Sequence, residues 1–469
     1  MNQTPALDTV RHIHFIGIGG SGLSAIARVL MEQGLEVSGS DLVLSSAARA
    51  LAQDGVRVSV GHRPENIAGA DLIVVSSAIP ATNVEIAAAQ AAGIPVIKRP
   101  ELLAMMTGGY QTIAVAGTKG KTTTTAMVAS ILLEAGYDPT FIVGGVIVGP
   151  ERNGRAGKGP YFVIEADEYD RTFLSLKPHI AVVTNVEYDH PDCYPTFAGF
   201  RDAFETFAAS VPQDGLLVVG WDDLTARRLG VRRGTNGGTT AFFGLSEGAE
   251  WRAEEIRPNF AGGVDFLATR NGKVVGLIRL RLPGAHNASN AVAALAVATF
   301  LDVPIHLAQS ALAAFQGVRR RFEIRGTLGG ITVVDDYAHH PSAIRATLQA
   351  ARGRFPGRPL WAVWQPHTYS RTLALLEQFA QAFDLADHVI VLPIYPARES
   401  DTWGVRSADV VARMRHQDAR CADSVEEAVA WLKTGVQPGD VVLTLSAGDG
   451  NRAGEMLLQF LEEKRATQA

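Results

Sequence analysis

Residues 112–125 read Thr-Ile-Ala-Val-Ala-Gly-Thr-Lys-Gly-Lys-Thr-Thr-Thr-Thr, an apolar run followed by a glycine-flanked lysine–threonine turn. In such a turn, Gly117 and Gly120 allow backbone N–H groups to point at phosphate oxygens, and a following helix adds its positive N-terminal end. Lys121 would then reach the β- and γ-phosphates, and the Thr122 hydroxyl would bind Mg²⁺. The stretch therefore predicts a strand, a phosphate-binding loop and a helix that hold a nucleoside triphosphate.

The residues after the turn support this interpretation. Met127, Val128, Ile131 and Leu132 recur at the spacing of one buried helix face, and Gly136 marks the end of the helix. The loop is two residues shorter than the general G-x-x-x-x-G-K-[ST] pattern, so the prediction depends on this context. The alternative is an ordinary solvated Gly-Lys-Thr turn, which the strand before and the helix after make the weaker interpretation.

Composition limits the classes of protein to consider. At 469 residues, the chain predicts about three domains of roughly 150 residues each. A net charge of −5 predicts no strongly basic surface, so we expect no nucleic-acid partner. Two cysteines cannot build a disulfide framework, which favours a reducing compartment. The N-terminus has no signal-peptide pattern, so we expect a cytoplasmic protein without membrane contact. As a separate expectation, the protein is a monomer or a weak homodimer.

Short apolar runs alternate with amphipathic stretches, which predicts α/β units with mostly parallel sheets. The stretch 240–282 differs, because its short alternating runs favour antiparallel strands added to the central unit. We predict three domains: a Rossmann-like domain over 1–108, a P-loop ATPase-type α/β domain over 109–318 and a Rossmann-like domain over 319–469. The expected strands are 12–16, 36–38, 57–60, 72–76, 95–98, 112–116, 161–165, 180–184, 215–219, 332–335, 360–364, 389–393 and 441–445.

A second glycine-rich turn lies near the N-terminus. The run from Gly17 to Gly22 fits G-x-G-x-x-G between a predicted strand and a helix, and Asp41 lies 19 residues beyond Gly22. In dinucleotide-binding folds these positions hold a pyrophosphate and a ribose hydroxyl. The alternative is a turn that only permits close strand–helix packing. The next unit begins near Thr112, so binding of one nucleotide diphosphate is at least as well supported as binding of NAD.

Polar residues follow several predicted strands, where α/β sheets present ligands. Glu165 ends one strand and is a candidate Mg²⁺ ligand, although a solvated acidic loop would look similar. His190 follows the next strand, and its role stays open because Mg²⁺ prefers oxygen. In the last unit, Arg371 matches a carboxylate of a zwitterionic substrate. The pair at 339–340 resembles a zinc site, but no third ligand at a familiar spacing is evident.

Taken together, these motifs resemble the Mur ligase family, ATP-dependent amide-forming enzymes of peptidoglycan precursor synthesis, and in particular its alanine-adding members. The resemblance extends over essentially the whole chain, and its motifs occur in the family's order. The matching segments are Ile16–Gly22, Gly117–Thr122, Glu165–Glu168, Thr184–His190, Gly284–Asn290, Arg319–Phe322, Asp335–Pro341 and Gln365–Arg371.

The resemblance implies ATP and Mg²⁺ as cofactors and UDP-N-acetylmuramate and L-alanine as substrates. It implies that the lactyl carboxylate is activated as an acyl phosphate, which the alanine amine then attacks. The residues that it implies for ATP are Gly117, Thr118, Lys119, Gly120, Lys121, Thr122, Thr123, His286, Asn287, Asn290, Arg321 and Asp336. Those implied for the two substrates are Gly17, Gly19, Gly20, Ser21, Gly22, Asp41, Ser77, Tyr337, His339, His367 and Arg371. The implied catalytic residues are Lys121, Glu165, His190, His339 and Arg371, and the implied metal ligands are Thr122, Glu165 and His190.

Two positions depart from the family pattern. Lys119 stands where the alanine-adding members usually carry histidine, which adds a positive charge beside the phosphates. Thr368 replaces an arginine that many relatives have, so carboxylate recognition would depend on Arg371. Three alternatives remain open: a recycling ligase that adds an intact tripeptide to the same sugar nucleotide, an NAD-dependent oxidoreductase, and a non-catalytic nucleotide-binding regulator.

Overall fold

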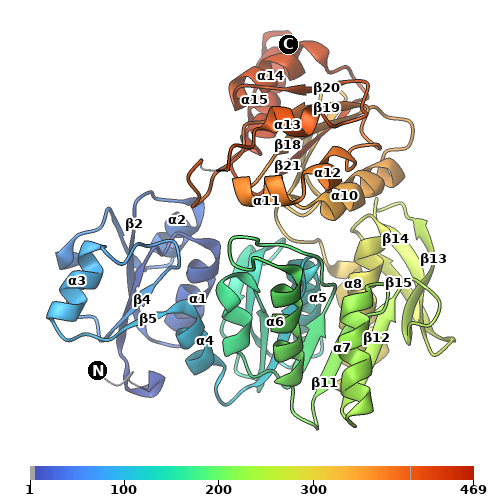
Figure 1. Cartoon of the computed structure of the whole chain (residues 1–469). Helices are drawn as coiled ribbons and strands as arrows, with labels where there is room; N and C mark the ends of the chain where they lie inside the picture. Colours follow the sequence, from blue (N-terminus) through green and yellow to red (C-terminus); the bar gives the residue numbers. More distant parts are fainter. Residues whose placement is uncertain (1–5, 402, 469) are drawn as a thin grey trace.

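The computed structural model of the chain describes residues 6–401 and 403–468, and within them the side chains of Ser21 and Gln468 lie outside the description. The described residues form three α/β units, each built on its own sheet (Figure 1). The third unit lies above the second in this view, and the first lies beside the second. The sequence prediction of three α/β units is confirmed.

The first unit has a five-stranded parallel sheet in the order β3-β2-β1-β4-β5. All five residues of β1 are buried, which places this strand in the middle of the core. The strands are β1 (His12–Ile16), β2 (Glu36–Asp41), β3 (Arg57–Val60), β4 (Leu72–Val75) and β5 (Val96–Lys98). The helices are α1 (Ser21–Glu32), α2 (Ser46–Gln53), α3 (Val84–Ala91) and α4 (Arg99–Thr107), with short 3₁₀ turns at Leu7–Thr9 and Pro64–Ile67.

The second unit has a ten-stranded sheet in the order β15-β14-β13-β12-β11-β10-β6-β9-β7-β8. Its middle is parallel, and β13, β14 and β15 form the antiparallel addition that the sequence predicts. The prediction is wrong for β12, which lies in the same stretch but pairs in parallel with β11 and β13. The antiparallel pair β7–β8 at the other edge was not predicted. The strands are β6 (Gln111–Ala116), β7 (Thr140–Ile147), β8 (Arg152–Arg155), β9 (Tyr161–Glu165), β10 (Ile180–Val183), β11 (Leu216–Gly220), β12 (Thr239–Gly244), β13 (Trp251–Pro258), β14 (Val264–Arg270) and β15 (Lys273–Leu280).

The helix that follows the phosphate loop is buried on nearly all sides. Helix α5 (Lys121–Glu134) is buried at nearly every position from Thr122 to Leu132, not along one face only. It lies against the sheet on one side and against α8 and α9 on another. These two helices cover the face of α5 that would otherwise be exposed to solvent, so the helix has more than the one buried face that the sequence predicts. The other helices of this unit are α6 (Phe197–Ala209), α7 (Leu224–Thr235), α8 (Ala285–Phe300) and α9 (Ile305–Ala314), with a 3₁₀ segment at Tyr169–Ser175.

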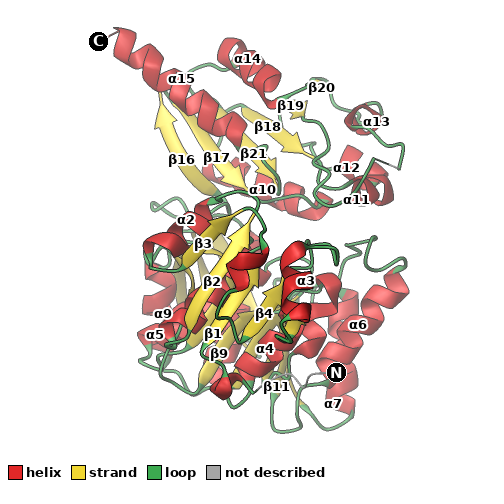
Figure 2. Ribbon diagram, turned by 90° about the vertical axis from the view of Figure 1, so that its left-hand side faces the viewer, coloured by secondary structure: helices red, strands yellow, loops and turns green. Residues whose placement is uncertain are grey.

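The third unit has a six-stranded sheet in the order β16-β17-β21-β18-β19-β20, in which only the edge strand β16 runs antiparallel. Helix α15 (Arg452–Gln468) packs across β16, β17 and β21 (Figure 2). The strands are β16 (Glu323–Leu328), β17 (Ile331–Asp336), β18 (Leu360–Gln365), β19 (His388–Val391), β20 (Ala419–Cys421) and β21 (Val441–Ser446). The remaining helices are α10 (Pro341–Arg354), α11 (Tyr369–Ala374), α12 (Leu376–Ala380), α13 (Ser407–Val411) and α14 (Val425–Gly435).

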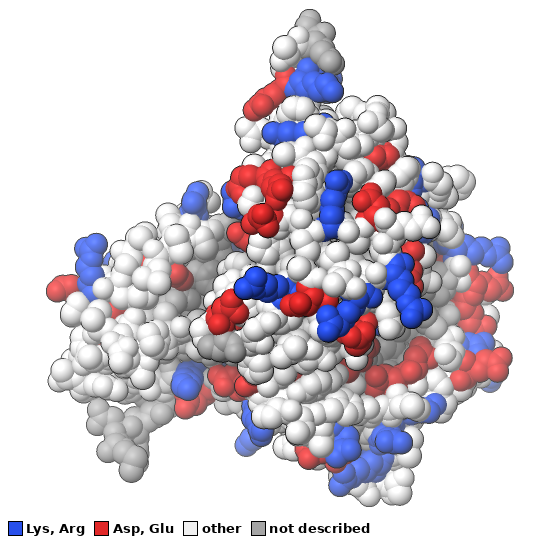
Figure 3. Space-filling view, turned by 45° about the horizontal axis from the view of Figure 1, so that its top comes forward, with Lys and Arg blue, Asp and Glu red and all other residues white. Residues whose placement is uncertain are grey.

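One large cavity of about 1540 Å³ is lined by residues of all three units. The phosphate loop follows β6, polar residues follow β9 and β10, and others follow β17 and β18. These are carboxyl ends of parallel strands, where α/β sheets bind ligands. Positive and negative side chains are interspersed over the face in Figure 3, in agreement with the small net charge of −5. Among the described helices, none combines the length and the apolar character needed to cross a bilayer.

Candidate active site

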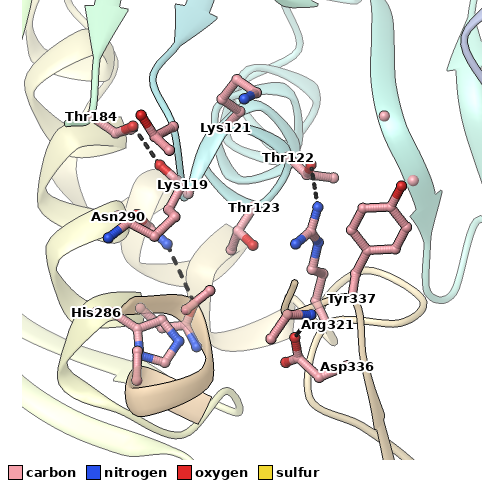
Figure 4. A pocket seen from close by; sticks show the side chains of 18 of the residues that line it. Lys119, Lys121, Thr122, Thr123, Thr184, His286, Asn290, Arg321, Asp336 and Tyr337 are labelled. Carbon is pink, nitrogen blue, oxygen red and sulfur yellow. Dashed lines mark hydrogen bonds between the residues drawn. The ribbon is translucent and has the colours of Figure 1, made fainter. Parts of the chain in front are cut away.

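The phosphate loop fits its surroundings only with glycine at its two glycine positions. Gly117 has φ +130° and Gly120 has φ +83°, both on the left-handed side. A Cβ at Gly117 would lie 2.0 Å from Thr184 Oγ1, and one at Gly120 would lie 2.6 Å from Asn290 Oδ1. The loop is therefore pressed between the end of β10 and helix α8 (Figure 4).

Lys121 is held by a carboxylate that sequence reasoning did not select. Its Nζ donates to both oxygens of Glu168, at 2.8 and 2.7 Å, and to the carbonyl oxygen of Gly117 at 2.7 Å. The Glu168 side chain is fully buried. Burial opposes the charge of Lys121, but Glu168, Asp167 and Glu165 outweigh it and raise the lysine pKa. Lys121 is thus fully charged and lies in the large cavity, where a triphosphate would need it.

Thr122 and Glu165, two of the residues expected to hold Mg²⁺, are hydrogen-bonded to each other. Thr122 Oγ1 donates to Glu165 Oε1 at 3.0 Å, and the Gly144 amide donates to the other carboxylate oxygen at 2.7 Å. Arg321 donates to Thr122 Oγ1 at 3.2 Å (Figure 4). Burial raises the pKa of Glu165 in spite of the nearby Lys121 and Arg321. A half-buried carboxylate with a hydroxyl beside it is an oxygen donor set that fits Mg²⁺.

His190 belongs to a second acidic group. Ligand atoms of Glu168, Asp189 and His190 all lie within 4.8 Å of one another. His190 Nε2 lies 3.6 Å from Glu168 Oε1 and 3.8 Å from Asp189 Oδ2. Sequence reasoning selected His190 but neither of its acidic neighbours. These two oxygens and one nitrogen offer a second place for a divalent cation next to Lys121.

Arg371 is already paired with a protein carboxylate. Its Nε donates to Asp189 Oδ1 at 2.6 Å, and both side chains are only 3% exposed. Burial alone would raise the pKa of Asp189, but Arg371 and the nearby histidines hold it well below its usual value. A substrate carboxylate would therefore meet an arginine whose Nε is bonded to Asp189 and whose Nη1 is bonded to His367. Thr368, the other departure in this segment, is buried at φ +65° before α11 and is not among the residues that line the cavity.

Two histidines of the third unit line the cavity as neutral groups. His339 Nδ1 donates to the Tyr337 carbonyl oxygen at 2.8 Å, and its ring centre lies 5.7 Å from that of His367. His367 Nδ1 accepts from Arg371 at 3.0 Å. Burial and the charge of Arg371 lower both pKa values, that of His367 to about 3. The Tyr337 ring faces the Arg321 guanidinium at 4.9 Å.

Of the residues expected to bind ATP, three lie at the start of α8. Asn287 Nδ2 donates to the Pro283 carbonyl oxygen at 2.7 Å, and Asn290 donates to Asn287 Oδ1 at 3.4 Å. Burial, and then the charge of Lys119, lower the pKa of His286 to about 4, so its ring is neutral. Asp336 accepts from the backbone amides of residues 322 and 338, so it shapes the Arg321 turn, and burial raises its pKa to about 6.

The glycine turn of the first unit faces Asp41, the residue expected to hold a ribose hydroxyl. Asp41 Oδ2 accepts from the Gly19 amide at 2.8 Å. Gly17 has φ +85°, and Gly22 lies against the Arg99 guanidinium, so the turn is tight on both sides. Of the residues expected to bind the sugar nucleotide in this unit, Gly22 lines the large cavity, and Gly17, Gly19, Gly20, Asp41 and Ser77 do not. The Ser77 hydroxyl instead donates to Asp170 Oδ2 of the second unit at 2.8 Å.

Three family models match this chain in sequence order. They are the Mur ligase family catalytic domain over residues 12–111, the Mur ligase middle domain over 115–298 and the Mur ligase glutamate ligase domain over 320–448. The chain belongs to the Mur ligase family. The resemblance seen in the sequence motifs is therefore confirmed, and membership of a ligase family decides against the oxidoreductase alternative.

Several relatives and solved structures are similar to this chain over nearly its whole length. This Mur ligase is 42% identical to the UDP-N-acetylmuramate--L-alanine ligase of Caldanaerobacter subterraneus, covering 98% of this chain and 99% of the relative. It is 44% identical to the enzyme of the same name from Sorangium cellulosum, covering 98% of each chain. Among solved structures, the UDP-N-acetylmuramate-alanine ligase of Thermotoga maritima superposes with a TM-score of 0.81 at 29% identity, over 97% of this chain and 99% of that chain. A murein peptide ligase from Psychrobacter arcticus gives 0.72 at 28% identity, over 96% and 98%.

Proposed function

We propose that this Mur ligase joins L-alanine to the lactyl carboxylate of UDP-N-acetylmuramate, with ATP converted to ADP and phosphate, in peptidoglycan precursor synthesis. One observation carries the proposal. The chain aligns along 98% of its length with relatives of that activity, and its phosphate loop, acidic groups and third-unit polar residues line a single cavity.

We also propose a division of labour among the three domains. Residues 1–108 would bind the UDP moiety at the glycine turn, where Asp41 already orders the Gly19 amide. Residues 109–318 would bind ATP, with the phosphate loop on its triphosphate and the start of α8 beside adenine. Residues 319–469 would present L-alanine, because Tyr337, His339 and His367 line the same cavity as Lys121.

In the first step, an oxygen of the lactyl carboxylate attacks the γ-phosphorus, the bond to the β-phosphate oxygen breaks, and ADP leaves. The Lys121 ammonium would donate hydrogen bonds to the γ-phosphate in place of some of those it gives to Glu168, and its positive charge would stabilise the transition state. Thr122 and Glu165 would hold Mg²⁺, and the group of Glu168, Asp189 and His190 offers a second cation position. Bound Mg²⁺ would supply further neutralisation of phosphate charge.

In the second step, the unprotonated alanine amine attacks the acyl carbon, the bond to the phosphate oxygen breaks, and the nitrogen gives up one proton to the departing phosphate, which leaves an amide. The neutral His339, whose Nδ1 donates to Tyr337, can accept a hydrogen bond from the amine at Nε2, and the neutral His367 adds no positive charge that would repel the ammonium form. An acyl phosphate is hydrolysed by water, so the third unit has a chemical reason to cover the cavity.

Acceptor-dependent phosphate release tests the proposal. The purified chain receives MgATP and UDP-N-acetylmuramate, and release is compared with L-alanine, with L-alanyl-γ-D-glutamyl-meso-diaminopimelate and with no acceptor. We expect release with alanine that is far faster than with the tripeptide or with no acceptor. Because the murein peptide ligase superposes almost as well, faster release with the tripeptide would replace this proposal by the recycling activity. Equal release in all three arms would refute both.

A further inference from the structure

Lys119 connects the phosphate loop to the third unit. Its Nζ donates to Glu187 Oε1, which follows β10, and to the hydroxyl of Ser342 in the first turn of α10. The Ser342 hydroxyl also contacts the other Glu187 oxygen, and His340 Nδ1 lies 2.8 Å from that hydroxyl. His340 Nε2 in turn lies 3.3 Å from the carbonyl oxygen of Tyr188. The start of α10 is thus attached to the second unit through the contacts among Lys119, Glu187 and Ser342, and through His340 at the Tyr188 carbonyl oxygen.

We propose that Lys119 is a positioning residue that holds the third unit over the phosphate loop through Glu187 and Ser342, and so places His339 for the amino acid. This inference rests on the proposed function for the identity of the amino acid only. Lys119, Glu187, Ser342 and His339 all line the cavity, and His339 precedes α10 by two residues. A shift of the start of α10 would therefore move His339 directly.

The backbone at Lys119 is held in place by hydrogen bonds to residues that follow β10. Its amide donates to Asn185 Oδ1 at 3.1 Å, and its carbonyl oxygen accepts from Asn185 Nδ2 at 3.0 Å. Thr184 Oγ1 donates to the same carbonyl oxygen (Figure 4). Three polar contacts thus fix the peptide from which the side chain extends. Because the loop is fixed, the Lys119 side chain can determine where the start of α10 lies. A mobile loop would instead move together with α10 and could not position it.

Charge and burial make the contact hard to replace. The Lys119 side chain is 24% exposed and that of Glu187 is 35% exposed. Burial lowers the pKa of Lys119, and the adjacent Glu187 counteracts this effect. Without the ammonium, Glu187 and Ser342 would lose a charge-assisted donor at the junction of the two units. The third unit would then dock less tightly, although the phosphate loop and the Lys121 contacts would remain.

The test compares Lys119→Met, Ser342→Ala and their double variant with the full-length wild type. Lys158→Met is the matched control, because Lys158 is an exposed lysine of the same unit. We expect Lys119→Met to raise the KM for L-alanine by about tenfold or more, the typical size of one charge-assisted contact. The KM for ATP should change much less. The double variant should be no worse than the poorer single variant, because the two residues act through one contact.

Small-angle X-ray scattering supplies a readout that does not depend on activity. At saturating nonhydrolysable ATP analogue, we expect a larger radius of gyration for Lys119→Met and Ser342→Ala than for wild type and Lys158→Met. Equal radii in all four proteins, or multiplied KM effects in the double variant, would overturn the inference. If wild type released no phosphate with alanine, the proposed function would fail, while the scattering comparison would still decide the role of Lys119.

Discussion

Removal of the Lys121 ammonium group should destabilise the ligand-free protein, because it leaves the buried Glu168 carboxylate without a cation. Lys121→Met keeps the length and apolar stem of the side chain but removes its charge. Glu168 accepts two hydrogen bonds from this lysine, and its side chain is 0% exposed. The substitution therefore leaves a fully buried carboxylate without its cation.

The size of the effect follows from this burial. Breaking a buried ion pair by removal of one partner costs about 3–5 kcal/mol, because the remaining charge is desolvated and unpaired. Adding Glu168→Gln removes that charge, so the double variant should lose only about 1–2 kcal/mol of hydrogen bonding. We therefore expect the double variant to be more stable than Lys121→Met alone.

Urea denaturation followed by far-UV circular dichroism measures this order, with Lys158→Met as the control for a lost exposed lysine. The expected midpoints fall in the order wild type and control, then double variant, then Lys121→Met. If the double variant is no more stable than Lys121→Met, the unpaired charge of Glu168 does not account for the loss of stability. In the same preparations, Lys121→Met should release no acceptor-dependent phosphate but still bind UDP-N-acetylmuramate, since that ligand is expected on another domain. A matched loss of sugar binding in a folded variant would contradict this separation.

Three further predictions concern the other carboxylates. Burial raises the pKa of Glu165, so the protonated side chain stabilises the fold at low pH, and this stabilisation is lost as the pH rises through the folded-state pKa. Glu165→Gln should therefore raise the melting temperature of the ligand-free protein at neutral pH, and it should abolish stabilisation of the protein by MgATP. A lower melting temperature of the ligand-free variant would refute the argument from burial. Asp189→Asn leaves buried Arg371 unpaired and should cost about 3–5 kcal/mol in denaturation midpoints and raise the KM for L-alanine, whereas an unchanged KM would remove Arg371 from alanine binding. Asp41→Ala frees the Gly19 amide and should weaken UDP-N-acetylmuramate binding in calorimetry by about tenfold, with ADP affinity as the internal control.

Local patterns predicted the elements that carry the ligand loops. The expected strands at 12–16 and 57–60 match β1 and β3, and the turn at Gly117 joins β6 to α5 as expected. These predictions work because apolar runs and glycine turns are decided by neighbouring residues. The edge strands β8, β16 and β20 were missed, since they show a weak apolar pattern and form only against a partner, and β7 was missed although its sequence is largely apolar. The burial of α5 on nearly all sides depends on α8 and α9, which lie far along the chain.

The sequence by itself determined the three α/β units, the phosphate loop with Lys121 and Thr122, and Glu165 as a partner for that threonine. Only the tertiary structure decided how the charges pair. It joined Lys121 to Glu168, Arg371 to Asp189 and Lys119 to Glu187. The physical reason is that the state of a charged group depends on burial and on neighbours within a few ångströms. Such neighbours come from different strand ends, so a residue's type and its place in the sequence do not reveal them.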